Sequence, residues 1–159
     1  MAERSQKNHL ISLTTPLGED ALLITAMYGH EALSEPFNFH LELAAEKNDL
    51  VADDIVGKGV TIKLIDNEDN PRDFHGYVSH FVAGELRPDG YRAYQAEVVP
   101  ALWFLNLRVN CQVYQNLSAV ELVEQITGLS TQIPIKLKKN LNSTYEKREY
   151  CVQFNETDF

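Results

Sequence analysis

The 159-residue sequence lacks the features that mark exported, membrane-spanning and disulfide-stabilised proteins. Its two cysteines are too few for a disulfide framework. No stretch approaches the roughly 18 consecutive apolar residues of a transmembrane helix. The polar N-terminus has no apolar signal-peptide segment. Eight glycines and six prolines are too few for a low-complexity or collagen-like chain. These absences predict a globular protein without a membrane span or signal peptide.

The two cysteines, Cys111 and Cys151, lie inside apolar runs that are typical of strands. Because no export signal is visible, we expect both thiols to be reduced and to behave as small hydrophobic side chains. The expected location of the chain is the cytoplasm.

Basic residues are also scarce: 14 Lys and Arg stand against 23 Asp and Glu, which gives a formal net charge of -9. Such an acidic surface repels phosphate backbones, so nucleic acid is not expected as a partner. The imbalance is uneven, because residues 1–70 hold 13 acids and 5 bases whereas residues 71–159 hold 10 acids and 9 bases. We interpret the excess as a solvated acidic face, with a surface for a basic partner as the alternative.

The sequence is rich in period-two alternation, the pattern of a strand with one buried face. It is clearest over residues 37–43, where every second residue is Phe or Leu. One short helix is predicted over residues 49–56, before Gly57. The first hundred residues hold about six strands, a count and spacing that favour a sandwich or a small barrel. The predicted strands are 9–13, 22–28, 37–43, 60–64, 73–82 and 91–99.

The C-terminal third has a different pattern. Ser118 followed by Glu121 is a capping box, which predicts a helix over residues 118–127. Beyond this helix, residues 133–137 and 148–154 are predicted to form strands, joined by a polar and basic loop.

No catalytic constellation, cofactor site or metal site is predicted. The motifs of phosphate-binding loops, serine hydrolases and zinc sites are missing. His75 and His80 are five residues apart, so in a regular strand they point to opposite faces. A metal ion shared by these two histidines would need a bulge between them. We therefore expect a protein that is not an enzyme and that carries no cofactor.

Two other functions stay open. A small-ligand barrel of lipocalin type would need a wide apolar interior. The aromatic residues expected inside instead indicate a filled interior; they are Tyr28, Phe37, Phe39, Phe74 and Tyr94. A metal-dependent hydrolase would use histidines together with nearby acids; the candidates are His30, His40, His75 and His80.

The most apolar stretch, Trp103, Phe104 and Leu105, follows Pro100. Its first interpretation is core. Exposed aromatic residues also mark subunit contacts, so these three residues are the candidate interface of the chain.

Five segments, in this order, resemble the N-terminal region of the VgrG family, the valine-glycine repeat spike proteins of bacterial type VI secretion. That family is similar in turn to the baseplate hubs of contractile phage tails. The segments are LSEPFNFHLEL (33–43), RDFHGYVS (72–79), YRAYQAEVVPALWFL (91–105), CQVYQ (111–115) and REYCVQFNETDF (148–159).

The resemblance implies a mainly β, phage tail hub-like fold: a small antiparallel barrel of about six to eight strands with one or two short helices. It implies a first hub barrel over residues 1–105. Residues 106–159 would be a helix-containing extension that completes this domain or starts a second one, truncated at Phe159.

The function implied is that of a non-catalytic hub linking the tube of a contractile injection machine to its puncturing needle. The implied partners are two further copies in a homotrimer, a hexameric tube protein, baseplate components and, through the needle, a tip protein. The chain would be assembled in the cytoplasm and then exported through the type VI apparatus.

Overall fold

A computed structural model describes residues 5–7, 9–66, 68, 70–129 and 133–159 of the chain. It contains two compact units, residues 1–100 and residues 101–159, and each is described by itself. The sequence prediction set the domain boundary after Leu105. In the structure, the 3₁₀ helix η2 (Ala101–Leu107) contacts the last strand of the chain and therefore belongs to the second unit.

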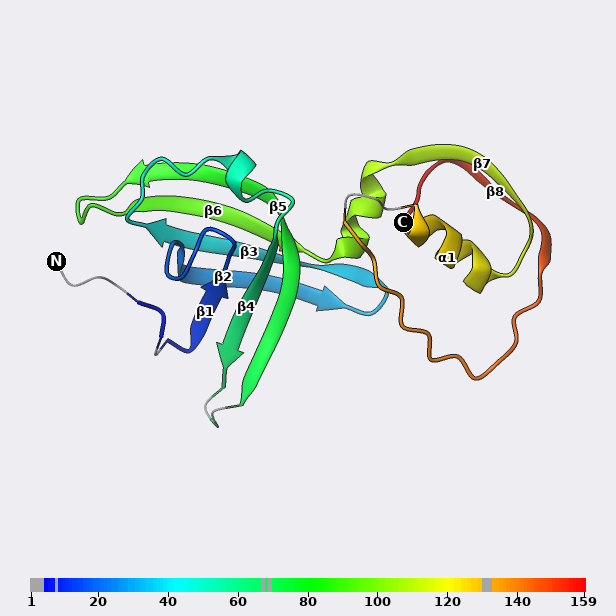
Figure 1. The fold of residues 1–159 in the computed structure, drawn as a ribbon, viewed down its shortest axis with the longest axis horizontal. Coiled ribbons are helices and arrows are strands. Elements are labelled where there is room, and N and C mark those ends of the chain that lie inside the picture. The colour runs from blue at the N-terminus through cyan, green and yellow to red at the C-terminus, as the bar shows by residue number, and fades with distance from the viewer. Residues whose placement is uncertain (1–4, 8, 67, 69, 130–132) are drawn as a thin grey trace. The chain divides into compact units, whose positions relative to one another are not determined.

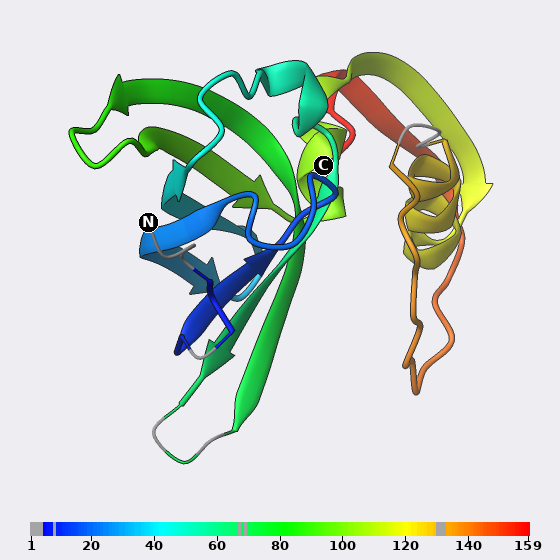
Figure 2. The same cartoon turned by 60° about the vertical axis from the view of Figure 1, so that its left-hand side comes forward.

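The first unit is a six-stranded antiparallel sheet with strand order β1-β4-β5-β6-β3-β2 (Figure 1). The sheet curls so that its two edge strands, β1 and β2, come into contact, which gives a half-barrel (Figure 2). The prediction of a mainly β fold with a small antiparallel barrel of six strands is confirmed. The elements are β1 (Ile11–Thr14), β2 (Leu23–Ala32), β3 (Glu35–Ala45), η1 (Ala52–Asp54), β4 (Gly59–Ile65), β5 (Pro71–Leu86) and β6 (Arg92–Val99).

The inside of the half-barrel is filled by the alternating residues that the sequence pattern identified. Leu41 and Leu43 of β3 are fully buried, and the ring of Phe81 stacks on that of Tyr94 at 5.1 Å between centroids. Tyr28 was also expected inside, but it is 61% exposed. The reason is a register shift in β2 between Ile24 and Ala26, which moves the following side chains to the other face, so that Met27 packs against the core and Tyr28 is exposed.

Strand β5 is bent by a register shift between Val78 and His80. The shift lies where β5 leaves its partner β4 and continues along β6. A bulge of this kind inserts one residue and moves the following side chains to the other face. Phe81 is consequently buried and Val82 exposed. Next to the bend, Gly76 has no room for a side chain, because a Cβ atom would lie 2.8 Å from the Val99 carbonyl oxygen.

A buried glutamine connects the two edge strands of the half-barrel. The Gln6 side-chain oxygen accepts hydrogen bonds from the backbone N–H groups of Leu13 (3.0 Å) and Ile24 (3.4 Å). Its amide nitrogen donates to the carbonyl oxygens of Leu13 (3.4 Å) and Leu22 (3.1 Å). The Gln6 amide thus takes the place of a peptide group between β1 and β2.

The second unit is a two-stranded antiparallel sheet with one helix against it (Figure 1). Besides η2 its elements are β7 (Val109–Leu117), α1 (Ala119–Gly128) and β8 (Arg148–Thr157). The predicted capping box is confirmed: the Ser118 hydroxyl accepts from the Glu121 N–H, and the Glu121 carboxylate accepts from the Ser118 N–H at 2.8 Å.

Two predicted elements differ from the structure. The strand predicted over residues 133–137 is wrong, because residues 133–147 contain no helix or strand. Pro134 lacks the N–H group that a strand ladder needs, and no neighbouring strand pairs with this segment. The helix predicted over residues 49–56 is only the three-residue η1, and Gly57 follows it with a positive φ of 74°.

Candidate interaction surfaces

The three residues of the candidate interface have different surroundings in η2. Leu105 is buried, whereas Trp103 and Phe104 are half-buried, with their rings in edge-to-face contact at 5.2 Å. The neighbouring Leu102 and Leu107 are exposed. Leu105 is therefore shielded from water. The two aromatic rings retain accessible surface, and their role in an interface stays a prediction.

A larger apolar surface lies on the hairpin of β7 and β8. In the antiparallel register, Cys111 is opposite Phe154 and Val113 is opposite Val152. Tyr150 and Val109 continue the same face, because they are in step along their strands. We call this set the β7–β8 face; its members are Val109, Cys111, Val113, Tyr150, Val152 and Phe154, and all are exposed.

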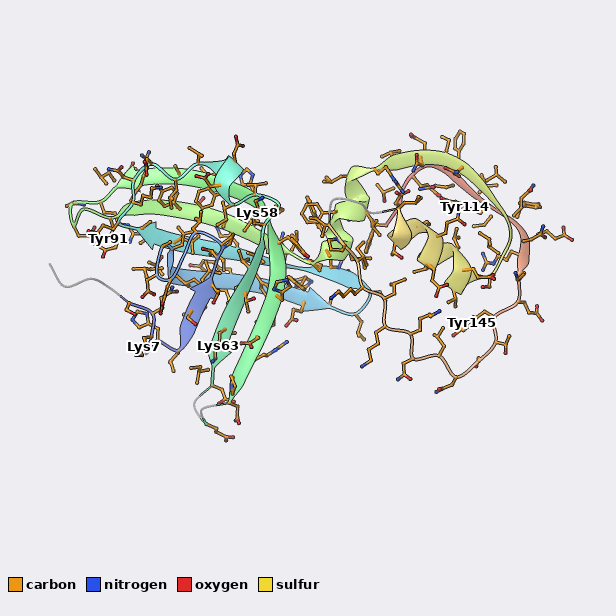
Figure 3. All side chains as sticks on the ribbon, in the orientation of Figure 1. Lys7, Lys58, Lys63, Tyr91, Tyr114 and Tyr145 are labelled. Atoms are coloured by element: carbon orange, nitrogen blue, oxygen red, sulfur yellow. The ribbon has the colours of Figure 1, made fainter. Side chains whose placement is uncertain are left out.

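The other side of the hairpin is covered, and its buried side chains are largely polar. Helix α1 lies along the inner side of the curved hairpin in both views (Figures 1 and 2). Tyr114, labelled on β7 in Figure 3, is buried on that side, as is Gln153 of β8. The Tyr114 hydroxyl donates to the Gln153 side-chain oxygen at 3.4 Å. The hairpin therefore presents its apolar residues outward and its polar residues inward.

The polar cluster inside the hairpin is centred on Asp158, whose carboxylate is completely shielded from solvent. It accepts hydrogen bonds from Arg108, from Asn110 at 3.1 Å and from Gln153 at 3.1 Å. Burial raises the pKa of Asp158, but these three hydrogen bonds together hold its pKa below the ordinary value. This cluster ties the end of β8 to the start of β7.

The hairpin formed by β2 and β3 extends beyond the core as an arm, residues 28–38. Strand β3 pairs with β6 only from Phe39 onward, so the arm is two strands wide. At its tip Leu33 is 98% exposed and Ser34 has a positive φ of 63°. The Arg72 guanidinium donates to the Glu31 carboxylate at 2.9 Å and anchors the arm to β5.

The four candidate histidines do not form a metal site among the residues that the structure describes. The bulge in β5 leaves both His75 and His80 exposed, so the prediction of opposite faces for them is wrong. A nitrogen of His75 lies 3.1 Å from the Thr61 hydroxyl. His30 lies 3.5 Å from the Glu35 carboxylate, and the His40 ring is near that of Tyr28 on the arm.

Aromatic rings pack against one another in the interior of the first unit, where a ligand of lipocalin type would need a wide apolar space. Besides the stacked pair already described, the Phe39 and Phe74 rings meet edge to face at 4.9 Å, and Phe37 stacks on Phe39 at the same distance. A hollow of about 470 Å³ instead lies at the surface, and its wall includes Gln6 and Asp20. In the described part of the chain, no helix is long and apolar enough to cross a membrane.

Comparison with curated proteins finds relatives among type VI secretion spike proteins. The chain is 32% identical over 158 residues to VgrG1b of Pseudomonas aeruginosa, covering 98% of this chain and 20% of that protein. It is 33% identical over 159 residues to VgrG1a of the same organism, covering 97% and 24% respectively. The chain spans about a fifth to a quarter of the length of these relatives. The predicted resemblance to VgrG proteins is confirmed.

A third relative is the actin cross-linking toxin VgrG1 of Vibrio cholerae, which is 29% identical over 154 residues. The match covers 89% of this chain but only 14% of the toxin.

The fold is also shared with a solved structure. The Escherichia coli c3393 protein is described as a type VI secretion component with structural similarity to the T4 bacteriophage tail proteins gp27 and gp5. It superposes with a TM-score of 0.78 over 92% of this chain and 40% of its own chain, at 20% identity. A sequence profile of the phage tail baseplate hub (GPD) family matches residues 30–159, which cover the first unit from residue 30 onward and the whole second unit. The chain belongs to the phage tail baseplate hub (GPD) family.

Proposed function

We propose that this chain is a structural hub module of the type VI secretion spike, which links the tube to the puncturing needle of a contractile injection machine. One observation carries the proposal: the match to the baseplate hub family spans residues 30–159, which take in most of the half-barrel and all of the hairpin unit. The relatives that are named spike proteins and the shared fold support it.

The module acts mechanically. Its half-barrel is held by continuous antiparallel pairing and a close-packed apolar interior, and close-packed interiors have low compressibility and transmit strain. Force applied along the assembly can therefore pass through the unit without covalent chemistry. The toxin activity in the name of the Vibrio cholerae relative belongs to that protein, of which this chain covers a small part.

The proposed partners are two further copies of the chain in a trimer, the ring of a hexameric tube protein, baseplate components and a tip protein carried by the needle. The half-buried rings of Trp103 and Phe104 are the proposed contact residues. The trimer would be assembled in the cytoplasm and exported through the secretion apparatus, as the spike relatives suggest.

Charge sets a condition on the trimer. Each copy carries a formal charge of -9, so like-charge repulsion opposes the close approach of three copies. At 0.1 M salt, exposed charges more than about 10 Å apart are largely screened from one another. The trimer fraction in sedimentation is therefore expected to rise between low and moderate salt. A trimer fraction that falls steadily over this range would contradict the proposed role of charge.

The direct test is binding to the tube protein of the same organism. The purified chain and preformed tube hexamers are mixed at moderate salt and sedimented together. Co-sedimentation that weakens in Trp103→Ser, but not in a matched Leu129→Ser variant, supports both the hub role and the contact residues; Leu129 is an exposed leucine of the same unit. No co-sedimentation at saturating tube protein would contradict the hub role.

A further inference from the structure

We propose that the tip of the β2–β3 arm of one copy of this chain docks in a groove between α1 and residues 137–145 of a second copy. The two surfaces lie on different units and are not alike, so the contact is head-to-tail and can close three copies into a ring. The number of copies rests on the proposed function, whereas the contact itself is argued from the two surfaces.

The arm presents one apolar side chain on a turn that is held in place. Leu33 is 98% exposed, the largest exposed fraction among the large hydrophobic side chains that the structure describes. Leu33 and Ser34 alone connect β2 to β3. The contact from Arg72 to Glu31 at 2.9 Å fixes the arm to β5. A segment that is already ordered loses little conformational entropy when it binds, which favours association.

The groove lies entirely in the second unit. It has a volume of about 310 Å³, and its walls are α1 and the segment that leads from α1 to β8, on which Figure 3 labels Tyr145. Ion pairs of Lys139 with Glu124 and of Lys147 with Glu121 (3.1 Å) tie this segment to the helix. The groove is therefore a braced hollow, and its lining is mainly apolar. Its exposed large apolar side chains are Val123, Leu137, Leu141 and Tyr145.

The arm and the groove match in apolar character and in charge. Ligand pockets begin at about 300 Å³, so the hollow has room for the Leu33 side chain. Residues 28–38 carry two glutamates and no lysine or arginine, whereas residues 136–148 carry five bases and one acid. Docking removes Leu33 from water and brings the Glu35 carboxylate, which is 64% exposed, to a rim that contains Lys138. Opposite charges that meet in this way favour the correct partner over others.

The contact is compatible with three-fold assembly. A head-to-tail contact forms a ring when the rotation from copy to copy closes, and in a ring of three every arm and every groove is occupied. The net charge of -9 on each copy opposes assembly at low salt. Moderate salt screens these distant charges, whereas partly buried pairs of opposite charge are screened much less. The contact is therefore expected under the conditions that favour the proposed trimer.

The first experiment is sedimentation velocity of the intact chain at moderate salt. A mass of three times 18.0 kDa is expected as the concentration rises. Leu33→Asn and Leu141→Asn each remove the apolar contact from one side and should weaken assembly about tenfold or more. Leu86→Asn and Leu129→Asn are the matched controls and should leave assembly unchanged, because each changes an exposed leucine of one unit outside the arm and the groove.

The second experiment locates the contact with a disulfide between copies. The exposed Cys111 is first removed by Cys111→Ser, and the remaining Cys151 is half-buried. Leu33→Cys together with Leu141→Cys then puts one thiol on the arm and one in the groove of every chain, and diamide oxidises the thiols that meet. On a denaturing gel without reductant, linked species of two and three chains are expected and none larger. Leu86→Cys with Leu141→Cys is the matched control and should not give these species.

Each outcome decides the proposal. A disulfide only within single chains overturns it, because the arm would then meet the groove of its own copy. A chain that stays monomeric, a trimer that survives Leu33→Asn, or an equal loss in the controls also overturns it. So do linkage beyond three chains and absence of linkage when Leu33→Cys is combined with Leu141→Cys and, separately, with Leu137→Cys. Binding of the unchanged chain to the tube protein is measured separately, so this contact and the hub role can fail independently.

Discussion

The two units of the chain are built in opposite ways. Among the described residues, 20 of the 23 buried hydrophobic side chains lie in residues 1–100 and three in residues 101–159. Large exposed hydrophobic side chains in the same described part of the chain show the reverse distribution, with seven in the first unit and 13 in the shorter second unit. The first unit also carries the whole net charge of the chain.

The difference shows what each unit needs for stability. A sheet that curls on itself buries its own apolar face and can present charge to water. A single hairpin with one helix cannot enclose six more apolar side chains, so they stay exposed and a polar cluster fills the inner side instead. We infer that the first unit is stable by itself, whereas the second gains stability from contacts on its open face.

The largest expected effect compares two phenylalanines. Phe39→Ala removes a ring that is 3% exposed and packs on two other rings, so it should cost roughly 3 to 5 kcal/mol of unfolding free energy. Phe154→Ala removes a ring from the open face and should change the free energy by about 0.5 kcal/mol or less in dilute, monomeric protein. Urea unfolding followed by far-ultraviolet circular dichroism measures both. Equal losses would remove the contrast between the units.

The next effect concerns closure of the half-barrel. Gln6→Ala removes the side-chain amide that is the hydrogen-bond partner of two backbone N–H groups and two carbonyl oxygens at the edges of the sheet. The free energy of unfolding should fall by roughly 1 to 3 kcal/mol. The amides of Leu13 and Ile24 should lose protection from hydrogen exchange, whereas those of the central strand β6 keep most of theirs. Unchanged exchange at both edge amides would show that backbone contacts alone close the sheet.

A smaller expected effect is a loss of stability of the second unit at low pH. The pKa of Asp158 is lower in the folded chain than its ordinary 3.8. Its stabilisation is therefore fully present above pH 4 and is lost as the pH falls through the lowered folded value. The stabilisation from Glu121 is lost in the same direction. Hydrogen bonds from the Ser118 N–H and, to a smaller extent, from the Lys147 side chain lower the pKa of Glu121 from 4.5 to about 2.

The single tryptophan, Trp103, lies in the second unit and provides the readout. The urea concentration at the unfolding midpoint, followed by the fluorescence of this residue, should decrease as the pH is lowered from 4 to 2. The Asp158→Asn variant should lose roughly 1 to 2 kcal/mol of unfolding free energy at pH 6. Its urea midpoint should therefore start lower and depend less on pH. An identical pH slope in wild type and Asp158→Asn would contradict the assignment to this carboxylate.

The smallest expected effect concerns the helix cap. Ser118→Ala removes the hydroxyl that accepts from the Glu121 N–H and should cost about 1 kcal/mol, confined to the second unit. Ser118→Asp keeps an acceptor and should restore most of the loss. A loss of the same size in the half-barrel strands would mean that the two units unfold together.

The sequence patterns predicted what depends on neighbours along the chain. Alternation over residues 37–43 identified a strand with its buried face, and Ser118 with Glu121 identified the only α-helix of the described residues. Both depend on local spacing. The family resemblance contributed the hub fold and the proposed function, which no local pattern contains.

Features that depend on distant partners could not be predicted in this way. The bulge after Val78 arises where β5 changes its neighbour from β4 to β6, and it reverses the faces of His80 and Phe81. The role of Gln6 depends on two strands that meet only when the sheet curls. The alternation at Tyr150, Val152 and Phe154 predicted a strand correctly, but alternation cannot say whether anything covers the apolar side.

The most direct test of the contrast between the units is amide hydrogen exchange of the intact chain in dilute solution, resolved by residue. The account predicts that amides of β3 and β6 open only with the free energy of global unfolding, and that amides of β7 and β8 open at a clearly lower free energy. One common opening free energy for all four strands would contradict it, because the chain would then be a single cooperative body.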